Sequence, residues 1–174
     1  LGTKAPEFNL KDAVTLNKVS LNFIKGQKGT LIMFICNHCP FVVHVKDEIV
    51  KIANEYQKKG FGFVAINSND ILKYPEDSPY NMLKYAVKFK FSFPYLFDET
   101  QKIAKAYGAS CTPDFFLFDK NLELVYRGQL DDSRPANKKP VTGKDLRTAL
   151  DRVIKGLAQK KEQKPSIGCN IKWK

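Results

Sequence analysis

The sequence predicts an α/β fold, with helices packed on a central sheet. Two short apolar runs, at 30–35 and 61–66, enclose an amphipathic segment about twenty residues long. This order predicts two parallel strands joined by a helix. Two further apolar segments, 115–118 and 122–126, flank the turn sequence Asp119-Lys120-Asn121 and predict a hairpin. A length of 174 residues and a hydrophobic fraction of 43% fit a single domain over 1–174 with a full core.

The first part of the chain predicts three strands. Phe8 and Leu10 alternate with polar neighbours, and Val19, Leu21 and Phe23 do the same, so residues 6–24 predict two short strands. Gly26-Gln27-Lys28-Gly29 then predicts a turn. The continuous apolar run from Thr30 to Ile35 is typical of a strand buried on both faces.

The segment from Cys39 to Lys58 predicts an amphipathic helix. Pro40 suits the first helical turn, where its missing N–H group costs nothing, and Gly60 ends the helix. Apolar residues recur at the three- and four-residue spacing of one helix face. They are Val42, Val45, Ile49, Ile52, Ala53 and Tyr56.

The rest of the chain predicts short elements between polar loops. A polar stretch with two prolines, 67–79, is long enough to form a functional lip. The expected elements after it are a helix at 80–89, a strand at 95–97, a helix at 99–107, the hairpin strands, an irregular loop at 131–140 and a final helix that begins near Thr142 or Gly143 and carries Leu146, Leu150, Val153, Ile154 and Leu157. From about residue 160 a basic, polar tail follows.

The net charge of the chain is strongly positive, but its distribution does not indicate a particular function. The formal charge of +11 comes mostly from lysines dispersed along the chain. Nucleic-acid binders usually concentrate charge and add arginine and stacking aromatics, and no such motif is present. No stretch approaches the ~20 apolar residues that span a bilayer. We therefore expect neither a nucleic-acid partner nor a membrane partner.

The tetrapeptide Cys36-Asn37-His38-Cys39 is the strongest chemical signal in the chain. It lies between a predicted strand and a predicted helix, so both sulfurs fall near the first helical turn. Peptide N–H groups there stabilise a thiolate and make a cysteine acidic and reactive. Four cysteines are too few for a disulfide scaffold, and a Cys-x-x-Cys in an α/β pattern indicates a redox motif.

Four segments together carry a family resemblance. They are Cys36-Asn37-His38-Cys39-Pro40-Phe41, Ala65-Ile66-Asn67-Ser68-Asn69-Asp70, Thr112-Pro113-Asp114-Phe115-Phe116-Leu117-Phe118-Asp119 and Tyr126-Arg127-Gly128-Gln129-Leu130-Asp131-Asp132. With the predicted element order, they resemble the thioredoxin-fold superfamily. Within it they resemble the bacterial peroxiredoxin-like branch, the alkyl hydroperoxide reductase/thiol-specific antioxidant proteins. The resemblance implies a thioredoxin-like fold with a central mixed sheet and extra N-terminal strands.

The resemblance also implies a thiol–disulfide oxidoreductase. By position, Cys36 is the expected nucleophile, on an exposed lip, and Cys39 the resolving thiol, one turn into the helix. A protonated His38 would favour the Cys36 thiolate, with an expected Cys36 pKa of roughly 5–7 and a more oxidising pair than in thioredoxin. No cofactor or metal is expected beyond the redox-active Cys36–Cys39 disulfide.

Two positions depart from the related families. Thioredoxins carry a buried carboxylate six residues before the first motif cysteine, where this chain has Thr30. Peroxiredoxins carry Pro and Thr ahead of their reactive cysteine, and neither precedes Cys36 or Cys39 at that spacing.

The dipeptide Thr112-Pro113 matches the cis-proline that thioredoxin-fold proteins place opposite the active-site disulfide. The resemblance makes both residues a substrate-binding feature. The Thr112 backbone would pair with an extended substrate segment, and Pro113 would shape the groove.

Several side chains keep more than one interpretation. Cys111 and Cys169 could be inert thiols, could form a disulfide with each other, or could relay electrons to the active site. His44 could join the motif cysteines and His38 in a metal cluster, although a helix residue with its own partner is the simpler interpretation. Asp114 and Arg127 could steer substrates or form an ion pair, and we favour the ion pair.

Two other functions stay open beside the oxidoreductase. One is a thiol peroxidase, since Cys39-Pro40 echoes the Cys-Pro of peroxiredoxins. The other is a copper or thiol carrier without turnover, because Cu(I) prefers thiolates. The expected partners are a disulfide-containing protein or a small thiol, plus a thiol reductant or oxidant. We expect a soluble monomer or weak dimer in the cytoplasm, or in the periplasm if a leader was removed.

Overall fold

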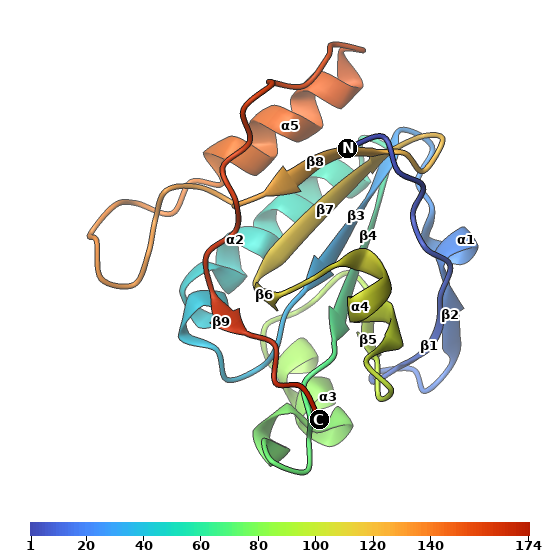
Figure 1. Cartoon of the computed structure of the whole chain (residues 1–174), viewed down its shortest axis with the longest axis vertical. Coiled ribbons are helices and arrows are strands. Elements are labelled where there is room, and N and C mark those ends of the chain that lie inside the picture. The colour runs from blue at the N-terminus through green and yellow to red at the C-terminus, as the bar shows by residue number, and fades with distance from the viewer.

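A seven-stranded mixed sheet forms the centre of the computed structural model, which describes residues 1–174 (Figure 1). The strand order is β2-β1-β5-β4-β3-β7-β8, and β6 and β9 form a separate two-stranded sheet. The strands are β1 (Asn9–Asp12), β2 (Lys18–Ser20), β3 (Gly29–Phe34), β4 (Phe61–Asn67), β5 (Tyr95–Phe97), β6 (Cys111–Thr112), β7 (Asp114–Asp119), β8 (Leu124–Gly128) and β9 (Cys169–Asn170). The helices are α1 (Leu21–Ile24), α2 (Pro40–Gln57), the 3-10 turn η1 (Pro75–Asp77), α3 (Pro79–Lys88), α4 (Lys102–Tyr107) and α5 (Lys144–Ile154).

Strand β3 is the central strand, and all six of its residues are buried. It pairs in parallel with β4 and antiparallel with β7. Leu31 and Met33 face the cluster built with α2, α3 and α5, whereas Ile32 and Phe34 face the cluster built with α1 and α4. The continuous apolar run in the sequence therefore reflects burial on both faces.

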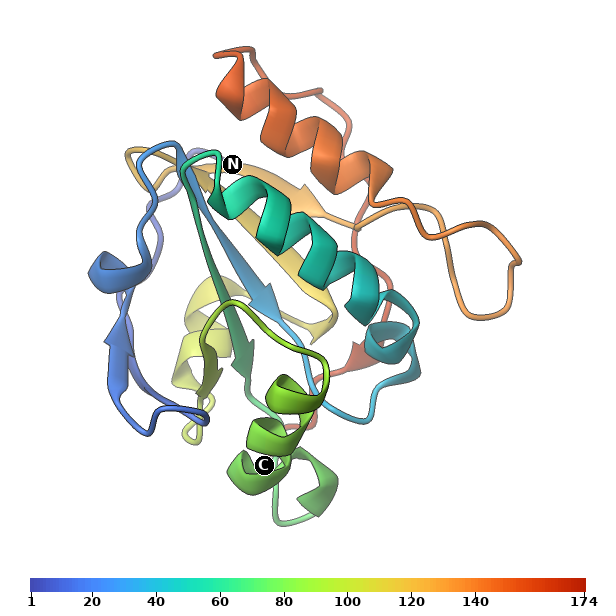
Figure 2. The ribbon, with the colours of Figure 1, turned by 180° about the vertical axis from the view of Figure 1, so that it is seen from behind.

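Helices α2 and α5 lie side by side on one face of the sheet (Figure 2). Pro40 is the first residue of α2, and the six apolar residues of the predicted stripe are all buried. The predicted strand–helix–strand unit and its boundaries are thereby confirmed. Even α2, with 18 residues, is amphipathic, and no helix combines the length and apolar character needed to cross a membrane.

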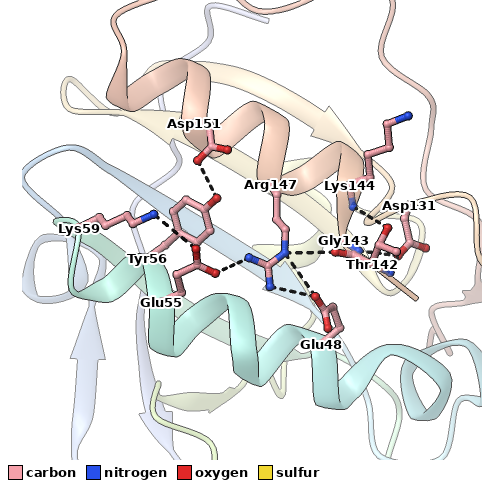
Figure 3. A network of polar contacts seen from close by, with 10 residues as sticks. All are labelled: Glu48, Glu55, Tyr56, Lys59, Asp131, Thr142, Gly143, Lys144, Arg147 and Asp151. Carbon is pink, nitrogen blue, oxygen red and sulfur yellow. Dashed lines mark hydrogen bonds and ion pairs between the residues drawn. The ribbon is translucent and has the colours of Figure 1, made fainter. Parts of the chain in front are cut away.

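Arg147 of α5 joins the two helices through carboxylates of α2 (Figure 3). Its guanidinium lies 2.9 Å from Glu48 and also contacts Glu55. One turn away, the Tyr56 hydroxyl donates to Asp151 at 2.7 Å. A fork of donors that meets carboxylates from a neighbouring helix fixes the position of α2 along α5.

The first turn of α5 is held by a buried carboxylate. Asp131 accepts the N–H groups of Thr142 and Gly143 at 2.8 and 2.7 Å. Gly143 itself has φ 69°, a backbone conformation that favours glycine. The predicted start of the last helix at 142 or 143 is confirmed, and the 131–140 loop is tied to that helix.

One predicted strand is wrong at its end. Leu21 and Phe23 were expected to continue the strand of Val19, but they lie in the short helix α1. The Ser20 hydroxyl accepts the N–H group of Phe23 at 3.2 Å and caps that helix. Phe23 is exposed, so the alternating pattern did not reflect two buried positions.

The tail also differs from expectation, because it contains a strand. Residues 163–166 run beside β8, where Gln129 N–H donates to Lys164 and the Ser166 hydroxyl donates to Gly128. The chain then forms β9 against β6 (Figure 1). Two-residue strands that pair only through tertiary contacts leave no periodic pattern in a sequence.

We predict that Arg147→Met lowers the free energy of unfolding by about 1–2 kcal/mol, since it leaves two carboxylates without their shared donor. Urea unfolding followed by circular dichroism measures the change. The matched control is Lys59→Met, which removes an exposed 3.4 Å contact to the same Glu55 and should cost less than about 0.5 kcal/mol. Equal losses in both variants would contradict this role of Arg147.

Candidate redox site

Both motif cysteines lie at the junction of β3 and α2, and both are buried. Cys36 follows the end of β3, and Cys39 is the residue that caps α2. The exposed fractions of the two residues are 1% and 0%. The expectation that Cys36 lies on an exposed lip is therefore wrong, because segments that follow it in the chain close over it.

Thr112 contacts both sulfurs. Its hydroxyl lies 3.5 Å from Cys36 Sγ, and its carbonyl oxygen lies 3.3 Å from Cys39 Sγ. Strand register explains the first contact, since Phe34 pairs with Asp114 and the same antiparallel progression brings Cys36 opposite Thr112. The Thr112–Pro113 peptide bond is cis, as predicted.

The pKa values of the two thiols are shifted in opposite directions. Hydrogen bonds, first from the Cys36 thiol and then from Cys169 and Thr112, lower the pKa of Cys39 to about 4, although burial opposes them. The hydrogen bond to Cys39, burial and the nearby Asp77 carboxylate raise the pKa of Cys36 far above its ordinary value. These shifts favour the negative charge on Cys39, whereas the sequence predicts the acidic thiol at Cys36, and that stays a prediction.

Asn37 fixes the turn between the two cysteines. Its backbone N–H donates to Asp77 at 2.8 Å, and its side-chain amide donates to the Glu76 carbonyl at 3.0 Å. The amide oxygen accepts the hydroxyl of the fully buried Tyr95 at 2.9 Å. Hydrogen bonds to β5 and to η1 therefore fix the position of Asn37 between the cysteines.

Asp77 is a buried carboxylate of the site that the sequence did not single out. Its side chain is fully buried and accepts from Asn69 at 2.9 Å. His38 Nδ1 lies 2.5 Å from Asp77 Oδ2, a close contact without hydrogen-bond geometry. The imidazole stacks on Tyr74 with ring planes 7° apart. Cys36, His38 and Asp77 place sulfur, nitrogen and oxygen atoms within 4.8 Å of one another.

This chain has Thr30 where thioredoxins carry a buried carboxylate, and a different residue, Asp77, places a buried carboxylate near the site. Thr30 is buried in β3, and its hydroxyl accepts the N–H group of Gly26, so it serves the turn before the strand. The carboxylate near Cys36 comes instead from the 67–79 segment. The signal for it was an acidic pair, Glu76-Asp77, inside the segment predicted as a functional lip.

Strand β9 occupies the position expected for a substrate. Thr112 pairs with Cys169, and Cys111 pairs with Asn170. The predicted substrate strand at Thr112 is replaced here by the tail of the same chain. Residues paired across a ladder share a face, and neighbours along a strand point to opposite faces. Cys169 therefore shares the Thr112 side, and Cys111 does not.

This register also bears on the Cys111–Cys169 disulfide considered from the sequence. The two side chains point to opposite faces of the β6–β9 ribbon, so the bridge does not fit this register. Cys111 is buried against the carbonyls of Pro113 and Ser166, and burial raises its pKa to about 12. Cys169 is partly exposed and packs against the cluster that contains both motif cysteines.

The remaining candidates have structural partners. His44 Nε2 is 2.7 Å from the Ser133 hydroxyl and takes no part in the Cys36–His38–Asp77 group. Arg127 forms a 3.2 Å ion pair with Asp114, as we favoured. Burial raises the pKa of Asp114, and Arg127 acts in the opposite direction.

The fold is thioredoxin-like, as a comparison with solved structures shows. A thiol:disulfide interchange protein of the thioredoxin family from Chlorobium tepidum has a TM-score of 0.68 at 16% identity, covering 88% of this chain and 97% of its own. An uncharacterised conserved protein from Geobacillus kaustophilus has a TM-score of 0.98 at 59% identity, covering 100% of this chain and 92% of its own.

Residues 1–146 match the Redoxin family, and the chain belongs to that family. This confirms the predicted thioredoxin-fold, peroxiredoxin-like membership. A curated relative, thiol-disulfide oxidoreductase ResA from Geobacillus thermodenitrificans, is 30% identical over 124 residues, which are 70% of this chain and 64% of the relative. The match thus spans slightly less than two thirds of that relative. Strand β9 lies outside the residues that match the Redoxin family.

We predict that the reduced protein shows one thiolate that forms as the pH rises through about 4 and is present at neutral pH. Thiolate absorbance measures it. Cys39→Ser should remove this step, and Cys36→Ala should raise the pKa of Cys39 because the main donor is lost. The control Cys111→Ser should leave the step unchanged. A first thiolate that appears only near pH ~8.5, the value of a free thiol, would contradict the assignment.

Proposed function

We propose that this protein is a thiol–disulfide oxidoreductase whose redox centre is the Cys36–Cys39 pair. The observation that carries the proposal is the contact of Thr112 with both buried sulfurs, its hydroxyl 3.5 Å from Cys36 Sγ and its carbonyl oxygen 3.3 Å from Cys39 Sγ. Such a pair can alternate between dithiol and disulfide without a change of fold. The relative named ResA is described as the same kind of enzyme.

The charge distribution favours an order of events different from the one inferred from chain position. Cys39, as thiolate, is the sulfur that attacks a partner disulfide, so the mixed disulfide with the partner forms on Cys39. Cys36 holds its proton and must lose it before it can attack Cys39 to close the disulfide. We therefore assign Cys39 as the sulfur that exchanges with the incoming thiol and Cys36 as the sulfur that closes the pair.

His38 is placed to move the proton of Cys36. A ring nitrogen of His38, Cys36 Sγ and a carboxylate oxygen of Asp77 all lie within 4.8 Å of one another, and His38 Nδ1 is 2.5 Å from Asp77. His38 would thus accept the Cys36 proton during oxidation of the pair and return it during reduction, with Asp77 as its positioning residue.

The substrate is proposed to be a protein or small-molecule thiol or disulfide. Stabilising a thiolate favours the reduced pair, so the pair should be more oxidising than thioredoxin, whose potential is about −270 mV.

Equilibration with glutathione redox buffers tests the function. After acid quenching and alkylation, mass spectrometry should show the Cys36–Cys39 disulfide rising with the oxidised fraction, and insulin reduction should follow with dithiothreitol as donor. Cys39→Ser should abolish both. A pair that stays reduced in every buffer while the protein consumes peroxide or binds Cu(I) would overturn the proposal in favour of a peroxidase or a metal carrier.

We predict that His38→Ala slows closure of the Cys36–Cys39 disulfide at neutral pH by about tenfold or more, the lower end of what a positioned base contributes. The rate of disulfide formation with excess oxidised glutathione measures the loss. His44→Ala is the matched control, because it removes the other histidine of the chain, which is bonded to Ser133. Equal rates for both variants and the wild type would exclude His38 as the base.

A further inference from the structure

Both sulfurs of the redox pair are buried, so an exchange partner needs a route to them. An exchange partner must bring its sulfur into contact with a sulfur of the protein. Cys36 and Cys39 expose 1% and 0% of their surface, so neither meets that requirement directly. Of the three cysteines on this side of Thr112, only Cys169 is partly exposed.

We propose that Cys169 is a third redox residue, which exchanges with Cys39 and carries the reaction between the buried pair and thiol partners. The proposal rests on the proposed function of the Cys36–Cys39 pair. It assigns a disulfide between Cys39 and Cys169 as an intermediate that presents a sulfur to solvent.

The strand registers place Cys169 at the site. Thr112 lies opposite Cys169 in the β6–β9 pair, and the β3–β7 register brings Cys36 opposite Thr112. Cys169 packs against the cluster that contains Cys39, and its thiol and backbone N–H both lower the pKa of Cys39. The three sulfurs therefore surround one threonine, although β9 and α2 are far apart in the sequence.

Gly168 allows this close approach. A side-chain carbon at that position would lie 1.9 Å from the Thr112 carbonyl oxygen, which no packing change nearby could relieve while β9 stays paired. The absence of a side chain lets the tail backbone cross directly over the residue that contacts both motif sulfurs.

Hydrogen bonds on both sides of β9 keep Cys169 in place. Before it, Gln129 N–H donates to Lys164 at 3.0 Å. After it, Ile171 is buried and its N–H donates to Ser110, while Lys172 binds Asn69 and Gln101. A segment anchored in this way is a fixed part of the site rather than a loose cover.

The first step conserves electrons and protons within the protein. Cys169 attacks the Cys39 sulfur of the oxidised pair, the Cys39–Cys169 bond forms, and the Cys36–Cys39 bond breaks. The proton of Cys169 passes to Cys36, whose environment favours the thiol. Burial and then contact with Cys39 raise the pKa of Cys169 to about 11 in the reduced protein, and the negative charge on Cys39 is absent once the pair is oxidised.

The later steps transfer two electrons from the partner. A partner thiolate attacks the Cys169 sulfur, a mixed disulfide forms, and Cys39 leaves as its stabilised thiolate. A second partner thiol attacks the mixed disulfide, the partner disulfide forms, and Cys169 leaves and takes up that thiol's proton. The sum is oxidation of two partner thiols and reduction of the Cys36–Cys39 disulfide, and the reverse sequence reduces a partner disulfide.

A trapping experiment tests the intermediate. In Cys36→Ser, oxidised glutathione should produce a peptide pair linked through Cys39 and Cys169, with Cys111 still alkylated. Peptide mass mapping without reduction detects it. If Cys39 instead carries only glutathione or stays reduced, and Cys169 is alkylated, the intermediate does not form and the proposal fails.

Kinetics separate this proposal from the proposed function. In stopped-flow reduction of the oxidised protein by reduced glutathione, Cys169→Ser should be about tenfold slower or more, because a positioned thiol is lost. Gly168→Ala, which keeps the thiol but displaces β9, should be slow too, whereas the control Cys111→Ser should react like the wild type.

The equilibrium potential decides which proposal fails. If the wild-type pair equilibrates with glutathione and all variants react at the same rate, the function stands and the role of Cys169 is wrong. If the wild-type pair does not equilibrate at all, the proposed function itself is wrong.

Discussion

The double pairing of β3 is the constraint on which the site depends. Its parallel bonds to β4 deliver the chain into α2, and its antiparallel bonds to β7 set which residue of the opposite strand meets Cys36. A shift of β7 by one residue would point Thr112 away from the sulfurs, because side chains alternate between the faces of a strand. Burial of β3 on both faces makes such a shift costly, so a packing requirement of the core also fixes the chemistry at its edge.

Charge around the pair comes from segments added to that core. Asp77 and His38 meet on one side of Cys36, and the β9 backbone lies on the side of Cys39. A buried carboxylate disfavours a second negative charge nearby, whereas N–H and S–H donors favour one. The environment thus separates two chemically identical thiols into one that holds a proton and one that does not.

The position of the two motif cysteines was predictable from the sequence, whereas the segments that cover them were not. Apolar runs, the α2 stripe and Pro40 are local patterns that predicted β3 and α2, and the family resemblance predicted the cis-proline with Thr112 opposite the motif. Asp77 lies in a polar segment whose only signal was its length and acidity. The pairing of Cys169 with Thr112 depends on contacts between distant residues, and two-residue strands carry no period that could reveal it.

The position of Cys169 late in the chain has a consequence for biosynthesis. A nascent chain emerges from its N-terminal end, and domains begin to fold as they emerge. The β3–α2 junction can therefore form while β9 is still unmade, and during that interval Cys36 and Cys39 lack the strand that lies over them in the finished protein. The dithiol would be open to any oxidant or thiol of the nascent-chain environment until Ile171 takes its place in the core. Strand β9 converts an unprotected pair of thiols into a covered one, so proteins cut short before β9 should react with a wider range of thiols and oxidants.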